Sequence, residues 1–202
     1  MSGLSEKEVF LLLSSLQCTH GFLGTFDCRF PGFINKVKVQ TAIINTGPRE
    51  QGGIHWIALA WDPKSYQMFI FDPLGWKNDQ LMKYYKFSYS NLIKRSALSS
   101  PDKCVKVIKN SQSVQCTCAG SCGLFCVFFL YCFYKYKSNA FKNCLFQSLY
   151  GSIPSLTPPN PTNLHKNQDF LYKFFKEKSL YFRQNEEYIV SNTKIGLIKS
   201  HI

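Results

Sequence analysis

The longest apolar stretch of the chain follows directly on a serine and a cysteine, in the sequence SCGLFCVFFLYCFY. Its apolar residues succeed one another without a polar face, which is typical of a helix buried on all sides. The run ends at Lys135 and is well short of the ~20 residues that a membrane-spanning helix needs. We therefore predict a buried central helix that starts near Cys122.

Shorter patterns predict the other elements. Residues 37–45, 54–61, 67–71 and 104–108 are rich in β-branched and aromatic residues, which indicates strands. Helices are expected at residues 5–16, where Ser5 and Glu8 form a capping box, at 79–87 behind an Asn78 cap, at 90–98 and at 164–178. A loop is expected at residues 21–33 and a proline-rich connection at 154–161, whereas the tail after Arg183 has no clear pattern.

The order of these elements predicts the fold class. Helices come first, then a small mixed or antiparallel sheet, then helices again, and this order is typical of an α+β fold. We expect the sheet to pack against the central buried helix, with the other helices flanking it.

Composition and charge narrow the class of protein. The chain has 202 residues, 45% of them hydrophobic, which favours one folded domain over residues 1–202. Its net charge of +12 suggests an acidic partner, with nucleic acid first and an acidic protein or membrane surface second. Nine cysteines are an odd number and too small a share for a secreted disulfide scaffold, and the N-terminus is a poor signal peptide. We expect a reducing compartment and mostly free thiols.

Candidate chemistry gathers around Cys122. The first turn of a helix favours a thiolate over a thiol, because the helix dipole and the unpaired N–H groups stabilise the anion. A thiol nucleophile needs a base and a group that orients the base. Of the four histidines, only His55 lies within a predicted strand, and Asp72 ends the next strand, where its carboxylate can hold an imidazole. The Gln115 amide and the N–H of Cys122 are candidates for an oxyanion hole.

Several strings carry a resemblance to a known family: FLGTFDCRFPGF, GGIHWIALAWDP, FDPLG, RSALSSPDKC, QSVQ and SCGLFC. Their order and spacing resemble the adenovirus protease family, from the N-terminal helix to about Asn139. The resemblance implies a cysteine endopeptidase with papain-like site geometry and the chain order His, acid, Cys. It implies His55, Asp72 and Cys122 as the catalytic triad, and Gln115 with Cys122 as the oxyanion hole. Familiar members carry Glu at the acid position, so Asp72 is a departure.

The resemblance also implies substrates, cofactors and a location. Viral precursor capsid and core proteins would be cleaved after Gly in (Leu/Met/Ile)-x-Gly-Gly or (Leu/Met/Ile)-x-Gly-x-Gly sites during virion maturation. A short viral activator peptide, the C-terminal fragment of a capsid precursor protein, would form a disulfide with Cys104. Viral DNA would be a second cofactor, bound without sequence preference, in keeping with the charge of +12. The expected enzyme is monomeric, uses no metal, binds no membrane, and acts in the virion and the host cell nucleus.

Other interpretations remain open from the residues alone. A non-enzymatic basic protein that packages DNA would share the positive charge, and a deubiquitinase-like protease would share the chemistry of Cys122. A zinc site is disfavoured, because a C-x-C-x3-C-x3-C spacing is poor for four ligands. The four cysteines with that spacing are Cys116, Cys118, Cys122 and Cys126. Small buried hydrophobes are expected at Cys126, Cys132 and Cys144, whereas Cys18, Cys28, Cys116 and Cys118 carry no interpretable signal.

Overall fold

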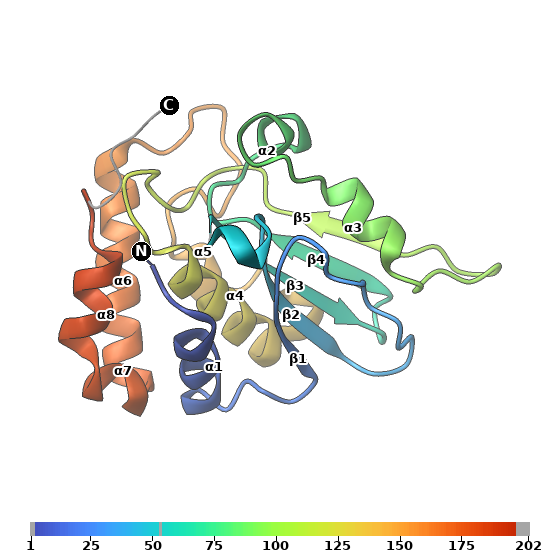
Figure 1. The fold of residues 1–202 in the computed structure, drawn as a ribbon, viewed down its shortest axis with the longest axis horizontal. Helices are drawn as coiled ribbons and strands as arrows, with labels where there is room; N and C mark the ends of the chain where they lie inside the picture. Colours follow the sequence, from blue (N-terminus) through green and yellow to red (C-terminus); the bar gives the residue numbers. More distant parts are fainter. Residues whose placement is uncertain (1–2, 53, 197–202) are drawn as a thin grey trace.

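A five-stranded mixed sheet forms the centre of the molecule in a computed structural model that describes residues 3–52 and 54–196 (Figure 1). The strands follow the spatial order β1-β2-β3-β4-β5. Strands β2, β3 and β4 are mutually antiparallel, whereas β1 runs parallel to β2 and β5 runs parallel to β4. Their bounds are β1 Phe22–Phe26, β2 Gln40–Asn45, β3 Trp56–Asp62, β4 Gln67–Phe71 and β5 Lys106–Lys109.

Helices cover both faces of this sheet (Figure 1). One face packs against α4, with α1, α6, α7 and α8 beyond it, and the other face packs against α2 and α3. The bounds are α1 Glu6–Ser15, α2 Asn78–Tyr85, α3 Tyr89–Arg95, α4 Cys122–Tyr136, α5 Cys144–Gln147, α6 Pro161–Lys178, α7 Leu180–Gln184 and α8 Glu186–Thr193, with 3-10 turns η1 Arg49–Gln51 and η2 Lys137–Asn139.

The middle strand β3 shows why the sheet needs two helical layers. The side chains of residues 56, 58 and 60 join the apolar cluster around α4, and those of 57, 59 and 61 join the cluster around α2 and α3. All seven residues of β3 are buried, as expected for a strand that is covered on both faces.

Helix α4 is the predicted central helix and is buried almost throughout. Every residue from its start to Leu130 is buried, as are Cys132 and Phe133. The first turn of α4 contains Gly123, whose lack of a side chain leaves room for the N-terminal segment. A Cβ at this position would lie only 3.1 Å from the side chain of Leu4, which is closer than ordinary van der Waals contact. No helix in the described ranges is long and apolar enough to cross a bilayer.

Most predicted elements are confirmed, together with the α+β fold class. The capping box of Ser5 and Glu8 is present, and β4 has the predicted bounds. The Asn78 cap was wrong: Lys77 is the N-cap residue of α2, and the Asn78 side chain accepts a hydrogen bond from the Tyr89 N–H instead. Local sequence did not reveal that alternative acceptor role.

Other segments also differ from the sequence-based expectation. Strand β1 lies inside the loop predicted at residues 21–33. It is an outer strand of the sheet and pairs only with β2. The strand predicted from residue 37 begins at Gln40, and the one predicted from Cys104 begins at Lys106. The tail after Arg183 contains α8, whose residues Ile189 and Thr193 are buried against the helical layer.

Candidate active site

His55 and Asp72 meet at one edge of the sheet. His55 immediately precedes β3, and Asp72 immediately follows β4. Because β3 and β4 are antiparallel, the start of one lies beside the end of the other. His55 Nε2 lies 2.7 Å from Asp72 Oδ1, with the two side chains 3% and 0% exposed to solvent. The sequence thus predicted this contact correctly.

The carboxylate of Asp72 is saturated with donors. In addition to His55, its Oδ1 accepts from the N–H of Leu74 at 2.9 Å. Its Oδ2 accepts from the N–H of Trp76 at 3.1 Å and from the Tyr89 hydroxyl at 2.8 Å. The chain turns sharply enough to aim both N–H groups at the carboxylate because Gly75 adopts a φ of +64°. Four bonds to two oxygens fix the orientation of the carboxylate.

Asn110 holds the backbone of Asp72 from the neighbouring strand. Its Oδ1 accepts from the Asp72 N–H at 2.9 Å, and its Nδ2 donates to the Asp72 carbonyl at 2.6 Å. Sequence reasoning missed both Asn110 and Tyr89. A signal existed for Asn110, which directly follows β5, because parallel strands β4 and β5 end at the same edge of the sheet.

Charges shift the pKa values of this pair against the effect of burial. Burial alone would lower the pKa of His55, but the charge and hydrogen bond of Asp72 and the contact with Cys122 raise this pKa to about 10. Burial alone would raise the pKa of Asp72, but His55, Lys109 and the Tyr89 hydroxyl hold it below its usual value. Both shifts favour the ion pair of a His55 imidazolium and an Asp72 carboxylate over two neutral groups.

Cys122 lies beside the imidazole. It is the first residue of α4, it is 9% exposed, and it is close enough to His55 to raise the pKa of the imidazole. The first turn of α4 is held close to β3 because Cys126 Sγ donates to the Trp56 carbonyl at 3.3 Å. The ring of Tyr85 covers the imidazole of His55, with 5.7 Å between ring centroids.

Gln115 lies in the loop that leads into α4. Its Nε2 donates to the carbonyl of Ala119 at 2.7 Å, and its side chain is 3% exposed. If the amide were turned round, Oε1 of Gln115 would face the carbonyl oxygen of Ala119, and neither oxygen can donate. The Ala119 carbonyl therefore fixes Nε2 at this position. One of the two amide hydrogens remains for a further acceptor.

Four other free cysteines bear on the expectations from the sequence. Cys126 and Cys132 are fully buried, and burial raises the pKa of both thiols, in keeping with the expected role as small hydrophobes. Cys144 was expected to be buried, and this was wrong, because it is exposed at the start of α5. Cys104 is an exposed free thiol two residues before β5.

Seven of the nine cysteines are free, as expected, whereas Cys116 and Cys118 are joined by a disulfide. The side chain of His165 on α6 lies beside these two cysteines, with its Nε2 3.6 Å from Cys118 Sγ. Of the other histidines, His20 is exposed before β1, and His201 lies outside the described residues.

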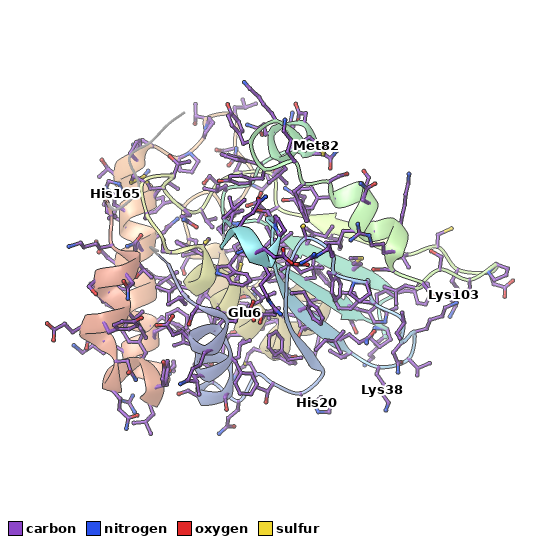
Figure 2. The ribbon with its side chains drawn as sticks, viewed as in Figure 1. Glu6, His20, Lys38, Met82, Lys103 and His165 are labelled. Carbon is purple, nitrogen blue, oxygen red and sulfur yellow. A yellow bond between two sulfur atoms is a disulfide. The ribbon has the colours of Figure 1, made fainter. Side chains whose placement is uncertain are left out.

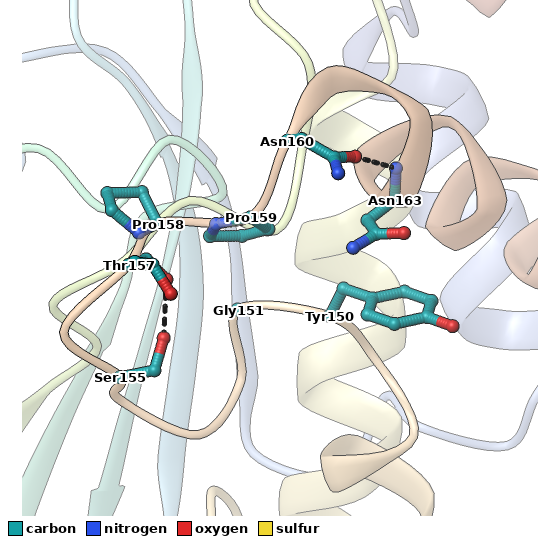
Figure 3. Close-up of a pocket in the computed structure, with 8 residues that line it drawn as sticks. All are labelled: Tyr150, Gly151, Ser155, Thr157, Pro158, Pro159, Asn160 and Asn163. Atoms are coloured by element: carbon teal, nitrogen blue, oxygen red, sulfur yellow. Dashed lines mark hydrogen bonds between the residues drawn. The ribbon is translucent and has the colours of Figure 1, made fainter.

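A cavity of about 390 Å³ lies beside the loop that leads to Gln115 (Figure 3). Tyr150, Gly151 and the segment 155–163 line it, and the Gln112 side chain donates to the Ser155 carbonyl at its margin. Figure 3 shows Pro158 and Pro159 forming one wall, with Tyr150 opposite Asn163. His55, Asp72 and Cys122 do not line this cavity.

A thiol at a helix start, an imidazole and a buried carboxylate are the side chains of a cysteine peptidase site. Comparison with known proteins gives the same class. A family model described as adenovirus endoprotease matches residues 22–197. The chain is 67% identical over 201 residues to the protease of Bovine adenovirus 4 and 66% identical over 201 residues to that of Ovine adenovirus D serotype 7, with 100% of each chain covered in both cases.

The comparison also includes a more distant adenovirus protease and one solved structure. The protease of Human adenovirus A serotype 12 is 40% identical over 195 residues, which cover 95% of each chain. Among solved structures, the chain is similar to the Chlamydia trachomatis effector protein ChlaDUB1, with a TM-score of 0.48 and 12% identity over 96% of this chain and 88% of that chain. The chain belongs to the adenovirus endoprotease family, and it is a cysteine peptidase.

Proposed function

We propose that this peptidase cleaves viral precursor capsid and core proteins after glycine during virion maturation, in the virion and the host cell nucleus. Its sites would be of the (Leu/Met/Ile)-x-Gly-Gly or (Leu/Met/Ile)-x-Gly-x-Gly type. The observation that carries the proposal is the imidazole of His55, which lies 2.7 Å from a buried carboxylate and contacts the thiol at the start of α4. Membership in the adenovirus endoprotease family supports the viral substrate class.

The catalytic roles follow from the chemistry of these side chains. The Cys122 thiolate attacks the scissile carbonyl, and the His55 imidazolium protonates the leaving amine. Asp72 orients the imidazole through its Nε2, which leaves Nδ1 to face the thiol. Water then attacks the thioester, with His55 taking its proton, and releases the acyl product.

The oxyanion of each tetrahedral intermediate needs donors that are already in place. The N–H of Cys122 has no acceptor within its own helix, because it belongs to the first turn of α4. The second amide hydrogen of Gln115 would supply the other donor, since the first is held by the Ala119 carbonyl at 2.7 Å. In our proposal these two groups form the oxyanion hole.

An activator peptide would bind along β5. This strand is last in the sheet order, and residues Lys106 and Val107 are exposed. An extended peptide can add its backbone hydrogen bonds to such an edge. The exposed thiol of Cys104 lies at the start of this edge, where it can pair with a peptide cysteine. The bond forms by thiol–disulfide exchange: the Cys104 thiolate attacks a mixed disulfide on the peptide cysteine and releases a small thiol.

DNA would act as a second, sequence-independent cofactor. The net charge of +12 supports electrostatic binding to phosphates. Exposed lysines lie in the last turn of α4 and in the segment after it, namely Lys135, Lys137 and Lys142. Lys176 and Lys178 are less available, because they pair with Glu186 and Glu177. Binding should weaken steeply with salt, since each neutralised phosphate releases counterions.

A substrate and cofactor panel tests the proposal. Wild-type protein is given fluorogenic Leu-Ala-Gly-Gly peptide and its Leu-Ala-Gly-Ala analogue, with and without a cysteine-bearing activator peptide and DNA. We expect cleavage of the glycine peptide only, stimulation by both additions, and loss of DNA stimulation at high salt. Cys104→Ser should lose the covalent peptide adduct in mass spectrometry, whereas Cys144→Ser, which also removes an exposed thiol, should keep it. Equal cleavage of both peptides, or an adduct in Cys104→Ser, would contradict the proposal.

A further inference from the structure

The loop between Gln115 and Cys122 carries a cluster that the proposed reaction does not use. Cys116 Sγ, Cys118 Sγ and His165 Nε2 all lie within 4.8 Å of one another, and each residue is half-buried. Among residues 3–52 and 54–196, this is the one cluster in which three or more Cys, His, Asp or Glu side chains lie close enough together to hold a metal ion. Figure 2 shows His165 near the start of α6, well apart from His20 at the lower edge of the view.

We propose that Cys116, Cys118 and His165 form a zinc-binding site when the two cysteines are reduced. Two thiolates and one imidazole are a ligand set that Zn²⁺ accepts, with water in the fourth position. The two thiolates also balance the charge of the ion, so the basic character of the chain does not oppose its binding. The inference does not depend on the proposed substrates or cofactors.

The distances favour this geometry. Zinc bonds of about 2.3 Å to sulfur and about 2.0–2.1 Å to nitrogen place sulfur and nitrogen about 3.5 Å apart in a tetrahedral site. Cys118 Sγ and His165 Nε2 are already 3.6 Å apart. The disulfide shows that the sulfurs of Cys116 and Cys118 point to the same place, so reduction leaves both directed at one ion.

The redox step is a simple exchange. A cellular dithiol transfers two electrons and two protons to the Cys116–Cys118 disulfide, giving two thiols while the dithiol itself becomes a disulfide. Binding of Zn²⁺ then releases the two thiol protons to solvent. The metal-bound form and the disulfide are therefore alternative states of one pair of sulfurs, and a reducing compartment favours the first.

The surrounding structure holds the three ligands in place. Helix α6 contacts the loop on both sides of the cysteines: Asn167 Nδ2 donates to the Val114 carbonyl at 2.8 Å, and Gln168 Oε1 accepts from the Ser121 hydroxyl at 2.9 Å. Both contacts come from residues within one turn of His165. The Cys118 carbonyl also accepts a backbone bond at 2.9 Å from Gly196. Little backbone movement is thus needed to bind an ion.

The sequence spacing alone concealed this site. The unfavourable C-x-C-x3-C-x3-C pattern includes Cys122, which contacts His55, and Cys126, which bonds to the Trp56 carbonyl. Neither of these sulfurs is available to the cluster. The third ligand instead comes from His165, 47 residues after Cys118. Zinc sites commonly combine a pair of ligands close in sequence with ligands from a distant segment, and three protein ligands leave the fourth position to water.

The experiment uses the full chain with the Cys122→Ala change, so that the catalytic thiol cannot bind the metal. The protein is reduced with a phosphine under nitrogen and titrated with Co²⁺, whose thiolate charge-transfer and tetrahedral d–d bands report the ligands. Zn²⁺ is then added as competitor, and metal content is measured by atomic emission. We expect about one ion per chain in the reduced protein and none in the oxidised protein.

Variants of the ligands decide the outcome. The Cys116→Ser/Cys118→Ser pair should lose the bands, and His165→Ala should bind about tenfold more weakly or worse. The control His20→Ala, which changes an exposed histidine elsewhere, should bind normally. Absence of metal in the reduced protein overturns the proposal, and so does unchanged binding in either ligand variant. If the cysteine variant does not fold, protection of Cys116 and Cys118 from alkylation by Zn²⁺ in the otherwise unchanged chain is measured instead, and equal labelling rates overturn it.

Discussion

Replacement of Asp72 by asparagine probes the buried carboxylate directly. The oxygen Oδ1 accepts from His55 and Leu74, and Oδ2 accepts from Trp76 and Tyr89, at distances of 2.7 to 3.1 Å. Asparagine offers one acceptor oxygen and an amide nitrogen that only donates. It can therefore satisfy only one side of this arrangement.

Each orientation of the new amide has a cost. If its oxygen faces His55, its nitrogen meets the N–H of Trp76, and a buried donor without an acceptor costs about 1–3 kcal/mol. If its oxygen faces Trp76, its nitrogen donates to Nε2 of His55, and the imidazole proton moves to the nitrogen next to Cys122. That tautomer cannot accept the thiol proton. Both orientations also remove the charge that raises the pKa of His55.

We expect Asp72→Asn to lower kcat by about 10³–10⁴-fold, equivalent to about 4–5.5 kcal/mol of transition-state stabilisation. KM should change little, because Asp72 is 0% exposed and does not reach the substrate. The assay is hydrolysis of a fluorogenic Leu-x-Gly-Gly peptide with the activating additions present, and circular dichroism verifies the fold.

Two further variants control this experiment. Asp62→Asn changes another buried aspartate at the opposite end of β3 and should leave kcat near the wild-type value. Asp72→Glu keeps the charge but adds a methylene at a fully buried position, so it should lose about 1–3 kcal/mol of stability and retain more activity than the asparagine variant. A folded Asp72→Asn protein with kcat within about threefold of wild type would refute the reasoning.

Three more predictions concern neighbouring groups. Gln115→Ala should lower kcat by about 10²–10³-fold in steady-state kinetics, and a change confined to KM would argue against an oxyanion donor. Tyr89→Phe removes a bond to a buried carboxylate and should lower the free energy of unfolding in urea by about 1.5–3 kcal/mol; an unchanged midpoint would contradict this. Because the folded pKa of His55 is raised from 6.5 to about 10, its stabilising contribution is full below pH 6.5 and is lost as the pH rises through about 10. The stability difference between wild type and Asp72→Asn should therefore shrink over that range, and a difference independent of pH would count against the charged pair.

The central features of the site were accessible from sequence because they depend on strand ends and a helix start. His55 and Asp72 flank successive strands, and antiparallel pairing of those strands brings the two side chains together. Cys122 begins a helix whose apolar pattern is unmistakable. Local pattern and pairing rules are sufficient for such contacts.

Other features depend on contacts between distant segments. Tyr89 reaches Asp72 from α3, and Asn110 reaches it from beyond β5, so neither role leaves a periodic pattern. His165 meets Cys118 through the packing of α6 on the loop before α4. Strand β1 was missed because it is short, contains a glycine and has no fully buried residue.

The most direct test of the account compares hydrolysis of the Leu-x-Gly-Gly peptide by wild type, Cys122→Ala and Cys132→Ala, each with DNA and the activator peptide. Cys132 is a buried thiol in the same helix and provides the matched control. We predict that turnover disappears in Cys122→Ala and persists in wild type and Cys132→Ala. Normal turnover by Cys122→Ala would show that the thiol at the start of α4 is not the nucleophile and would contradict the account.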